Sequence, residues 1–106
     1  MPAVTEAIHT YIDECCRCET PPRVSELAEK LGISRVTLYF HVKRAFGMTT
    51  QRLLTELQVA RSRQILEQTQ LSTTAVGYRA GFGTRRSFYR TFRKVTGVTP
   101  ARYRRG

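Results

Sequence analysis

Acidic residues are missing from the C-terminal part of this 106-residue sequence, which has no Asp or Glu after Glu67. Residues 68–106 hold nine Lys or Arg side chains, whereas residues 1–67 hold nine of them against eight acids. A basic surface that serves only solubility normally mixes both signs of charge. The uneven charge therefore predicts a polyanionic partner, with nucleic acid favoured over an anionic membrane.

Other absences narrow the class of protein. The sequence has no run of about 18 apolar residues, and residues 1–3 lack the segments of a secretory signal, so we expect a cytoplasmic, nucleoid-associated protein. It has two histidines, and the basic part has no carboxylate, so no acid–base or nucleophile constellation can be assembled there. The length predicts one domain, residues 1–106, without room for a catalytic cleft and lid. We therefore expect no enzyme.

Three cysteines are crowded into four positions, which argues against a disulfide framework. His9, Asp13 and Cys16 have a helical spacing that could bind a metal, with Cys18 as a fourth ligand. A thiol- or metal-responsive regulator is therefore an alternative. Because no paired C-x-x-C motif is present, ordinary thiols are the simpler interpretation, and we expect no metal and no cofactor.

One sequence pattern occurs twice, about fifty residues apart. Residues 24–47 and residues 73–97 each predict a short helix, a glycine turn and a longer helix with outward basic residues. The matched pairs are Val24/Thr73, Leu27/Val76, Leu31/Ala80, Gly32/Gly81, Ile33/Phe82, Leu38/Phe88, Tyr39/Tyr89, Val42/Phe92, Lys43/Arg93 and Gly47/Gly97, with one residue inserted near Gly83. This layout is typical of a helix-turn-helix DNA reader, so two copies predict a monomer with two recognition helices.

Helical spacing and cap residues predict an all-α fold of about seven helices. The first helix contains Val4, Ile8, Ile12 and Cys15 and ends before Thr20-Pro21-Pro22. We expect a first helix-turn-helix unit at residues 1–48, a stiff linker helix at 49–69 and a second unit at 70–106. The predicted caps are Ser25 or a neighbour, Ser34, Thr49 or Thr50, Thr84, and Thr99 followed by Pro100.

The same spacing assigns faces to the two recognition helices. The residues expected in the core are Leu38, Val42, Ala45, Phe88, Phe92 and Val95. The residues expected outside are Arg35, Val36, Tyr39, Phe40, Lys43, Arg85, Arg86, Tyr89, Arg90 and Arg93.

Several motifs resemble the DNA-binding domain of the AraC/XylS family of bacterial transcription regulators, across essentially the whole chain. They are Ala80-Gly81-Phe82, S-F-Y-R-T-F-R-K at residues 87–94 and G-V-T-P-A-R-Y-R at residues 97–104, with Leu27-Ala28, L-G-I-S at residues 31–34 and Leu38 in the first unit. The resemblance implies two recognition helices in successive major-groove segments on one DNA face. It also implies sequence-specific binding to double-stranded promoter DNA and contact with RNA polymerase; we expect the domain alone to be monomeric.

The chain departs from the family pattern at a few positions. Val76-Gly77 stands where the family usually has Ile-Ala, and a glycine inside a helix costs about 1 kcal/mol relative to alanine. Gln58-Val59 and Ser62 replace Arg-Leu and Ala in the linker helix. Phe40 stands where the family often has Arg.

Candidate DNA contacts follow from these helices. Arg85, Arg86 and Arg90 lie early on the outward face of the second recognition helix, and Arg86 and Arg90 are the strongest candidates for reading guanine. The predicted phosphate contacts are Arg35, Lys43, Arg44, Thr84, Arg93, Lys94, Arg102, Arg104 and Arg105.

The first recognition helix is less basic and leaves two interpretations open. In one, Val36, Thr37 and Tyr39 read thymine methyl groups and base edges. In the other, Phe40 packs on the linker helix or on a domain that this sequence does not contain. A stiff linker helix predicts a site of two short boxes about one helical turn, ~34 Å, apart.

The competing class is a basic protein- or membrane-interaction module. Residues 85–94 could lie on anionic lipid with Phe88 and Phe92 as the buried side. The duplicated fold needs both phenylalanines in its core, so we expect no membrane partner.

Overall fold

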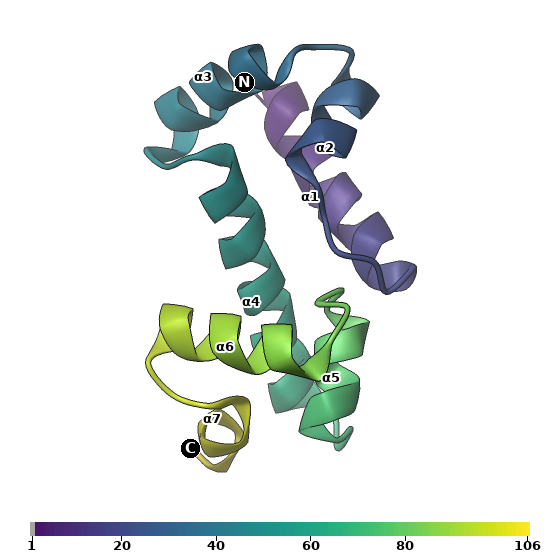
Figure 1. Cartoon of the computed structure of the whole chain (residues 1–106), viewed down its shortest axis with the longest axis vertical. Coiled ribbons are helices and arrows are strands. Elements are labelled where there is room, and N and C mark those ends of the chain that lie inside the picture. The colour runs from purple at the N-terminus through teal and green to yellow at the C-terminus, as the bar shows by residue number, and fades with distance from the viewer. Residues whose placement is uncertain (1) are drawn as a thin grey trace.

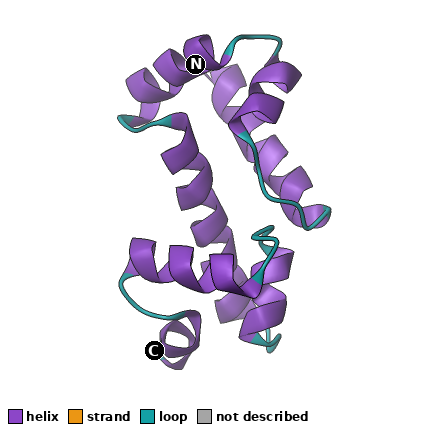
Figure 2. Ribbon diagram, in the orientation of Figure 1, coloured by secondary structure: helices purple, strands orange, loops and turns teal. Residues whose placement is uncertain are grey.

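Seven helices make up residues 2–106, the part of the chain that the computed structural model describes (Figure 1). They are α1 (Pro2–Arg17), α2 (Val24–Leu31), α3 (Arg35–Phe46), α4 (Thr50–Gln68), α5 (Thr73–Arg79), α6 (Arg85–Thr96) and α7 (Pro100–Arg105). Short loops connect them, and this described part contains no strand (Figure 2). The predicted all-α fold is confirmed, with α4 running from the group α1–α3 to the group α5–α7.

Hydroxyl side chains begin five of the seven helices. Each accepts the backbone N–H three residues later, at Ser34, Thr49, Ser72, Thr84 and Thr99. The predicted caps Ser34, Thr84 and Thr99 are confirmed, and Thr49 is the cap of α4. α3 ends at Gly47 and α6 ends at Gly97, both in the left-handed conformation. The repeat therefore extends from the N-cap of each recognition helix to the start of the helix that follows it.

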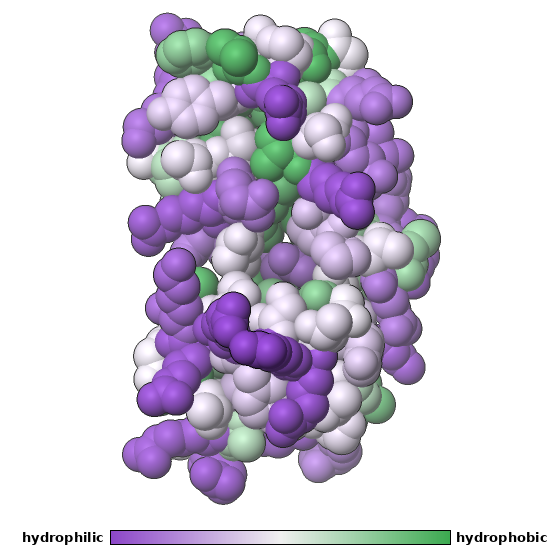
Figure 3. All heavy atoms as spheres, viewed as in Figure 1, coloured by the Kyte–Doolittle hydropathy of each residue, from purple (hydrophilic) through white to green (hydrophobic). Residues whose placement is uncertain are grey.

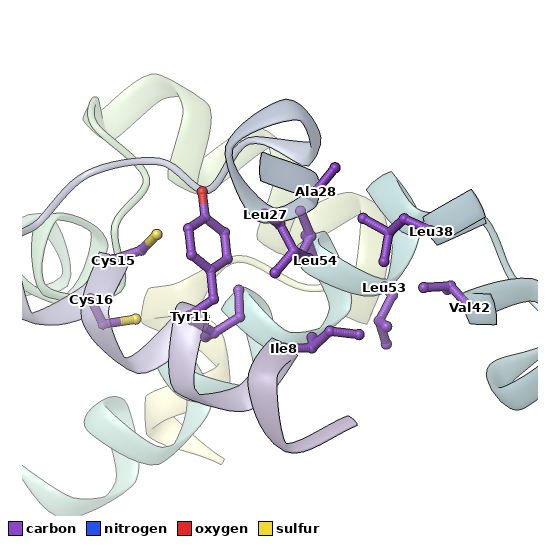
Figure 4. Packing of buried hydrophobic residues seen from close by; sticks show 11 residues of the cluster. Ile8, Tyr11, Cys15, Cys16, Leu27, Ala28, Leu38, Val42, Leu53 and Leu54 are labelled. Atoms are coloured by element: carbon purple, nitrogen blue, oxygen red, sulfur yellow. The ribbon is translucent and has the colours of Figure 1, made fainter. Parts of the chain in front are cut away.

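The start of α2 differs from the prediction. Arg23 is the N-cap residue and makes no side-chain cap bond, while Ser25 lies inside the helix. The Tyr11 hydroxyl from α1 instead holds the residue in front of α2, accepting the Arg23 N–H at 2.8 Å and donating to a Glu26 carboxylate oxygen at 2.7 Å. Figure 4 shows this hydroxyl directed at the segment that leads into α2. Burial is the main cause that raises the pKa of Tyr11 well above its usual value.

Two hydrophobic cores lie along α4. The first unites α1, α2 and α3 with Leu53 and Leu54 of α4 (Figure 4). The second unites α5 and α6 with Val59 and Leu66, and Tyr103 of α7 packs against it. Since opposite ends of one helix serve both cores, α4 fixes the distance between the two groups of helices.

Gly77 lies inside α5 where the aromatic ring of Phe88 approaches the backbone. A Cβ at this position would lie 2.7 Å from the Phe88 ring, which is closer than real Cβ contacts come. Phe88 is fully buried and has no free space to move into. The expected helix penalty of this glycine is therefore offset by the packing of Phe88 that its missing side chain permits.

Besides the connection through α4, a direct contact joins the two groups of helices. Gly81 has φ +81°, and a Cβ there would meet the Thr20 carbonyl oxygen at 2.8 Å, so the turn after α5 lies against the segment after α1. Gln58, buried on α4, donates to the Ala80 carbonyl at 3.2 Å. The second unit is thus held by both α4 and α1.

Three predicted orientations in the recognition helices are wrong. Ala45 and Val95, expected in the core, are exposed because both lie in the last turn of their helix, at the edge of its buried stripe. Phe46, the neighbour of Ala45, packs against the first core in its place. Tyr89, expected outside, is half-buried, with its hydroxyl bonded to the Thr73 hydroxyl.

Candidate nucleic-acid interface

The exposed face of α6 is a row of unpaired arginines. Arg85 lies over the ring of Tyr89, with its guanidinium carbon 4.3 Å from the ring centroid. Within residues 2–106, Arg86 and Arg90 have no hydrogen-bond or ion-pair partner, and both are exposed. Two arginines four residues apart on a helix share a face, so both can enter a groove together.

The start of α6 offers backbone donors beside these side chains. The Thr84 hydroxyl accepts the Ser87 N–H at 3.0 Å. The backbone N–H groups of Arg85 and Arg86, in the first turn, come before the first N–H that bonds within the helix, that of Phe88 to the Thr84 carbonyl, and they point out of the helix end. A helix N-terminus of this kind favours a phosphate, which fits the role predicted for Thr84.

The exposed face of α3 combines cations with apolar side chains. Val36 and Phe40 are each 64% exposed, and Tyr39 is 37% exposed. The rings of Tyr39 and Phe40 meet edge to face with centroids 5.5 Å apart. Phe40 therefore does not pack on α4, whereas its packing on a domain outside this sequence stays a prediction. The other exposed residues of this face are Arg35, Thr37, Lys43 and Arg44.

The ion pairs leave these candidate contacts free. Lys30 pairs with Glu14 at 3.5 Å, Arg79 pairs with Glu19 at 3.8 Å, and Arg61 pairs with Asp13. All three acids belong to α1 or the turn after it, and none of the described pairs uses a predicted DNA-contact residue. Figure 3 shows strongly hydrophilic side chains over α6, among residues of intermediate hydropathy.

Arg104 has a different partner from the one expected. Its guanidinium donates to the carbonyl oxygens of Leu66 at 3.2 Å, Thr69 at 3.3 Å and Leu71. These carbonyls lie at the end of α4 and in the loop before α5, so Arg104 ties α7 to this loop. We therefore remove Arg104 from the proposed phosphate contacts, while Arg102 and Arg105 remain exposed.

Arg104→Ala should lower stability rather than DNA affinity. The substitution removes charge-assisted hydrogen bonds to three carbonyls, and we expect the free energy of unfolding to fall by about 2 kcal/mol in urea titrations. Arg105→Ala is the matched control, because Arg105 is exposed; it should leave stability unchanged and weaken DNA binding. The reverse pattern would restore Arg104 as a phosphate contact.

One basic residue near the recognition helices was missed by the sequence reasoning. An open hollow of about 510 Å³ lies between the start of α4 and the end of α6. Its lining residues are Thr49, Gln51, Arg52, Thr55, Glu56, Thr91, Lys94 and Val95. Arg52 brings a second cation beside Lys94. The available signal was an outward basic residue in the first turn of the linker helix, directly after a recognition helix.

The side chains of the possible metal site do not lie together in the structure. His9 is exposed, whereas Cys16 is buried, and Asp13 is paired with Arg61. No three His, Cys, Asp or Glu side chains among residues 2–106 gather into a group that could hold a metal ion. Burial raises the pKa of Cys15 and raises that of Cys16 to about 11. Reactive cysteines of redox sensors are accessible and have lowered pKa values, so Cys15 and Cys16 do not fit this role.

We expect one fast-reacting thiol in the folded protein. Cys18 is exposed, whereas Cys15 and Cys16 are buried. A rise of the Cys16 pKa from 9.0 to about 11 lowers its thiolate fraction roughly 100-fold at neutral pH. Titration with Ellman's reagent should show one rapid equivalent, abolished by Cys18→Ser, and two more on unfolding. Two rapid equivalents would mean that α1 is not packed as described.

None of the helices within residues 2–106 is long and apolar enough to cross a membrane. This agrees with the absence of a long apolar run in the sequence.

Comparison with known proteins places this geometry among DNA-binding domains. A family model described as a helix-turn-helix domain matches residues 27–106. The transcriptional activator RhaS of Citrobacter koseri is 34% identical over 80 residues, which are 76% of this chain and 29% of that protein. The chain therefore spans less than a third of this relative.

Solved structures share the whole fold. The C-terminal domain of AraT, a response regulator from Geobacillus stearothermophilus, superposes with a TM-score of 0.84 at 29% identity, covering 99% of this chain and 85% of that one. The DNA-binding domain of the transcriptional factor AdpA, solved with a target DNA, gives a TM-score of 0.85 at 24% identity, covering 96% and 89%. The second likeness concerns the fold alone.

Proposed function

Because this chain belongs to the AraC/XylS family of helix-turn-helix DNA-binding domains, we propose that α3 and α6 enter successive major grooves on one face of promoter DNA. The members of this family are sequence-specific transcription regulators, so double-stranded DNA is the ligand. The observation that carries the proposal is the presence of two twelve-residue helices, α3 and α6, whose outward cations make no ion pair within residues 2–106 and which are held by α4 and by the α1–α5 contact.

The overall size sets an upper limit on the distance between the two boxes. The described molecule is 40 Å along its longest axis, so α3 and α6 lie closer together than this, and neighbouring major-groove segments on one face of DNA repeat every ~34 Å. Because α4 and the Gly81 contact fix the two units, the spacing of the boxes is set by the protein. DNA with another spacing must bend to engage both helices.

We divide the candidate DNA-contact residues into those that read bases and those that contact phosphates. We assign base reading to Arg85, Arg86, Arg90, Val36, Thr37 and Tyr39. Arg85, over the Tyr89 ring, is the most constrained of these. We assign phosphate contacts to Arg35, Lys43, Arg44, Thr84, Arg93, Lys94, Arg102 and Arg105, and we add Arg52. The cations fix the register of the protein on the duplex, and the base readers select the sequence.

The regulatory role proposed for the chain follows the named role of a relative. RhaS is named a transcriptional activator. We propose that the present chain likewise regulates transcription in the bacterial cytoplasm, binds its promoter as a monomeric domain and contacts RNA polymerase.

Selection from a random-sequence duplex library tests the proposal. The bound fraction is sequenced at two salt concentrations. We expect two enriched boxes about one helical turn apart. Binding without any enriched sequence would contradict a sequence-specific reader, and a single enriched box would contradict the simultaneous use of α3 and α6.

Arg52→Ala and Lys94→Ala test the hollow between α4 and α6. If both side chains neutralise phosphates, each substitution should weaken binding to all sequences alike and reduce the slope of log affinity against log salt by about 1. Fluorescence anisotropy at several salt concentrations measures this slope. An unchanged slope would remove the residue from the interface. A change in the enriched sequence would instead make it a base reader.

A further inference from the structure

The two recognition helices differ in chemistry at two exposed positions four residues apart, and both carry cations on either side of these positions. The two helices can be aligned by their N-cap residues, Ser34 and Thr84, and by their terminal glycines, Gly47 and Gly97. In this alignment residue n of α3 is equivalent to residue n + 50 of α6. Three cations of α3 are equivalent to cations of α6. These pairs are Arg35/Arg85, Lys43/Arg93 and Arg44/Lys94.

The two strongest base readers of α6 have apolar equivalents in α3. Val36 stands where α6 has Arg86, and Phe40 stands where α6 has Arg90. Both are 64% exposed, although exposing a phenylalanine to water is unfavourable. Phe40 meets the Tyr39 ring edge to face and still remains exposed. α3 therefore presents an apolar surface at the place where α6 presents guanidinium groups.

We propose that the two helices read different base chemistry: α3 recognises thymine methyl groups through Val36 and Phe40, whereas α6 recognises guanines through Arg86 and Arg90. This inference rests on the proposed two-box binding of DNA. The C5 methyl of thymine is the apolar feature of the major-groove edge of the bases, and guanine offers the acceptor pair that arginine binds. The cations Arg35, Lys43 and Arg44 hold the backbone beside the apolar surface.

The spacing of the two side chains predicts the spacing of the thymines. Four residues of helix rise about 6 Å, and base pairs stack ~3.4 Å apart. Val36 and Phe40 therefore reach thymines about two base-pair steps apart. The first box should carry two thymines at this separation, and the second box should carry guanines.

Deoxyuridine in place of thymidine removes the methyl group and keeps base pairing, so it isolates this contact. The probe is the duplex enriched with the parent protein, with uracil placed at single thymines of box 1, box 2 or the spacer. Each uracil at a contacted box 1 position should weaken binding about fourfold. Uracil in the spacer or box 2 should have no effect. Phe40→Ala should lose the sensitivity at its own position and keep that at the Val36 position.

A change of specificity gives a second readout. Phe40→Arg makes α3 resemble α6 at this position, and the enriched base there should change from thymine to guanine. If uracil in box 1 leaves affinity unchanged while Arg86→Ala still relaxes box 2, the inference is wrong and the two-box function stands. If the parent protein enriches no box at all, both the inference about base chemistry and the proposed two-box function are wrong.

Discussion

The double variant Arg86→Ala/Arg90→Ala should lose the preference for the second box while retaining general DNA affinity. Each arginine that binds a guanine through two donors contributes about 1–3 kcal/mol of discrimination, so each loss should cost about fivefold to 150-fold in specificity. Neither side chain has a hydrogen-bond or ion-pair partner among residues 2–106, so the substitutions should leave folding unchanged. Selection and sequencing with the variant measures the loss directly.

Arg17→Ala provides the control for this experiment. Arg17 is an exposed arginine at the end of α1, in a helix that also carries acidic residues, and Arg17→Ala removes one of the two positive charges that the double variant removes. We expect both boxes to remain enriched. Retention of the second box by Arg86→Ala/Arg90→Ala would show that α6 does not read bases through these arginines.

Phe88→Ala should produce the largest loss of stability. Phe88 is fully buried, contacts the rings of Phe82, Tyr89 and Phe92, and fills the space left by Gly77. Truncating a buried phenylalanine costs about 3–5 kcal/mol, a large part of the ~5–15 kcal/mol that stabilises a domain of this kind. Urea unfolding followed by circular dichroism measures the change.

Phe40→Ala is the matched control for stability. It makes the same chemical truncation on the other recognition helix, at a side chain that is 64% exposed. The free energy of unfolding should change by less than ~0.5 kcal/mol. Similar losses in the two variants would mean that Phe40 is packed against other residues.

Helix positions and ends were readable from the sequence because they depend on local chemistry. Ser34, Thr84 and Thr99 supply cap oxygens, and Gly47 and Gly97 adopt the left-handed conformation that ends a helix. The internal repeat then assigned the two recognition helices.

Contacts between distant segments were not readable in this way. Spacing predicts which stripe of a helix faces inward but not where the neighbouring helix ends, so Ala45 and Val95 were placed inside. Arg104 shows the same limit, because a basic residue gives no sign of the carbonyls that it meets thirty-odd residues earlier in the chain. Gly77 was assigned a helix penalty since the approach of Phe88 depends on tertiary packing.

Changing the distance between the two boxes tests the central claim most directly. Five or ten base pairs are inserted into the spacer of the enriched duplex, and affinity is compared with that for each box alone. A rigid pair of readers predicts that both insertions reduce affinity to that of a single box, because five pairs turn the second box to the opposite face and ten move it by a further ~34 Å. Undiminished affinity with either insertion would contradict the fixed arrangement of α3 and α6.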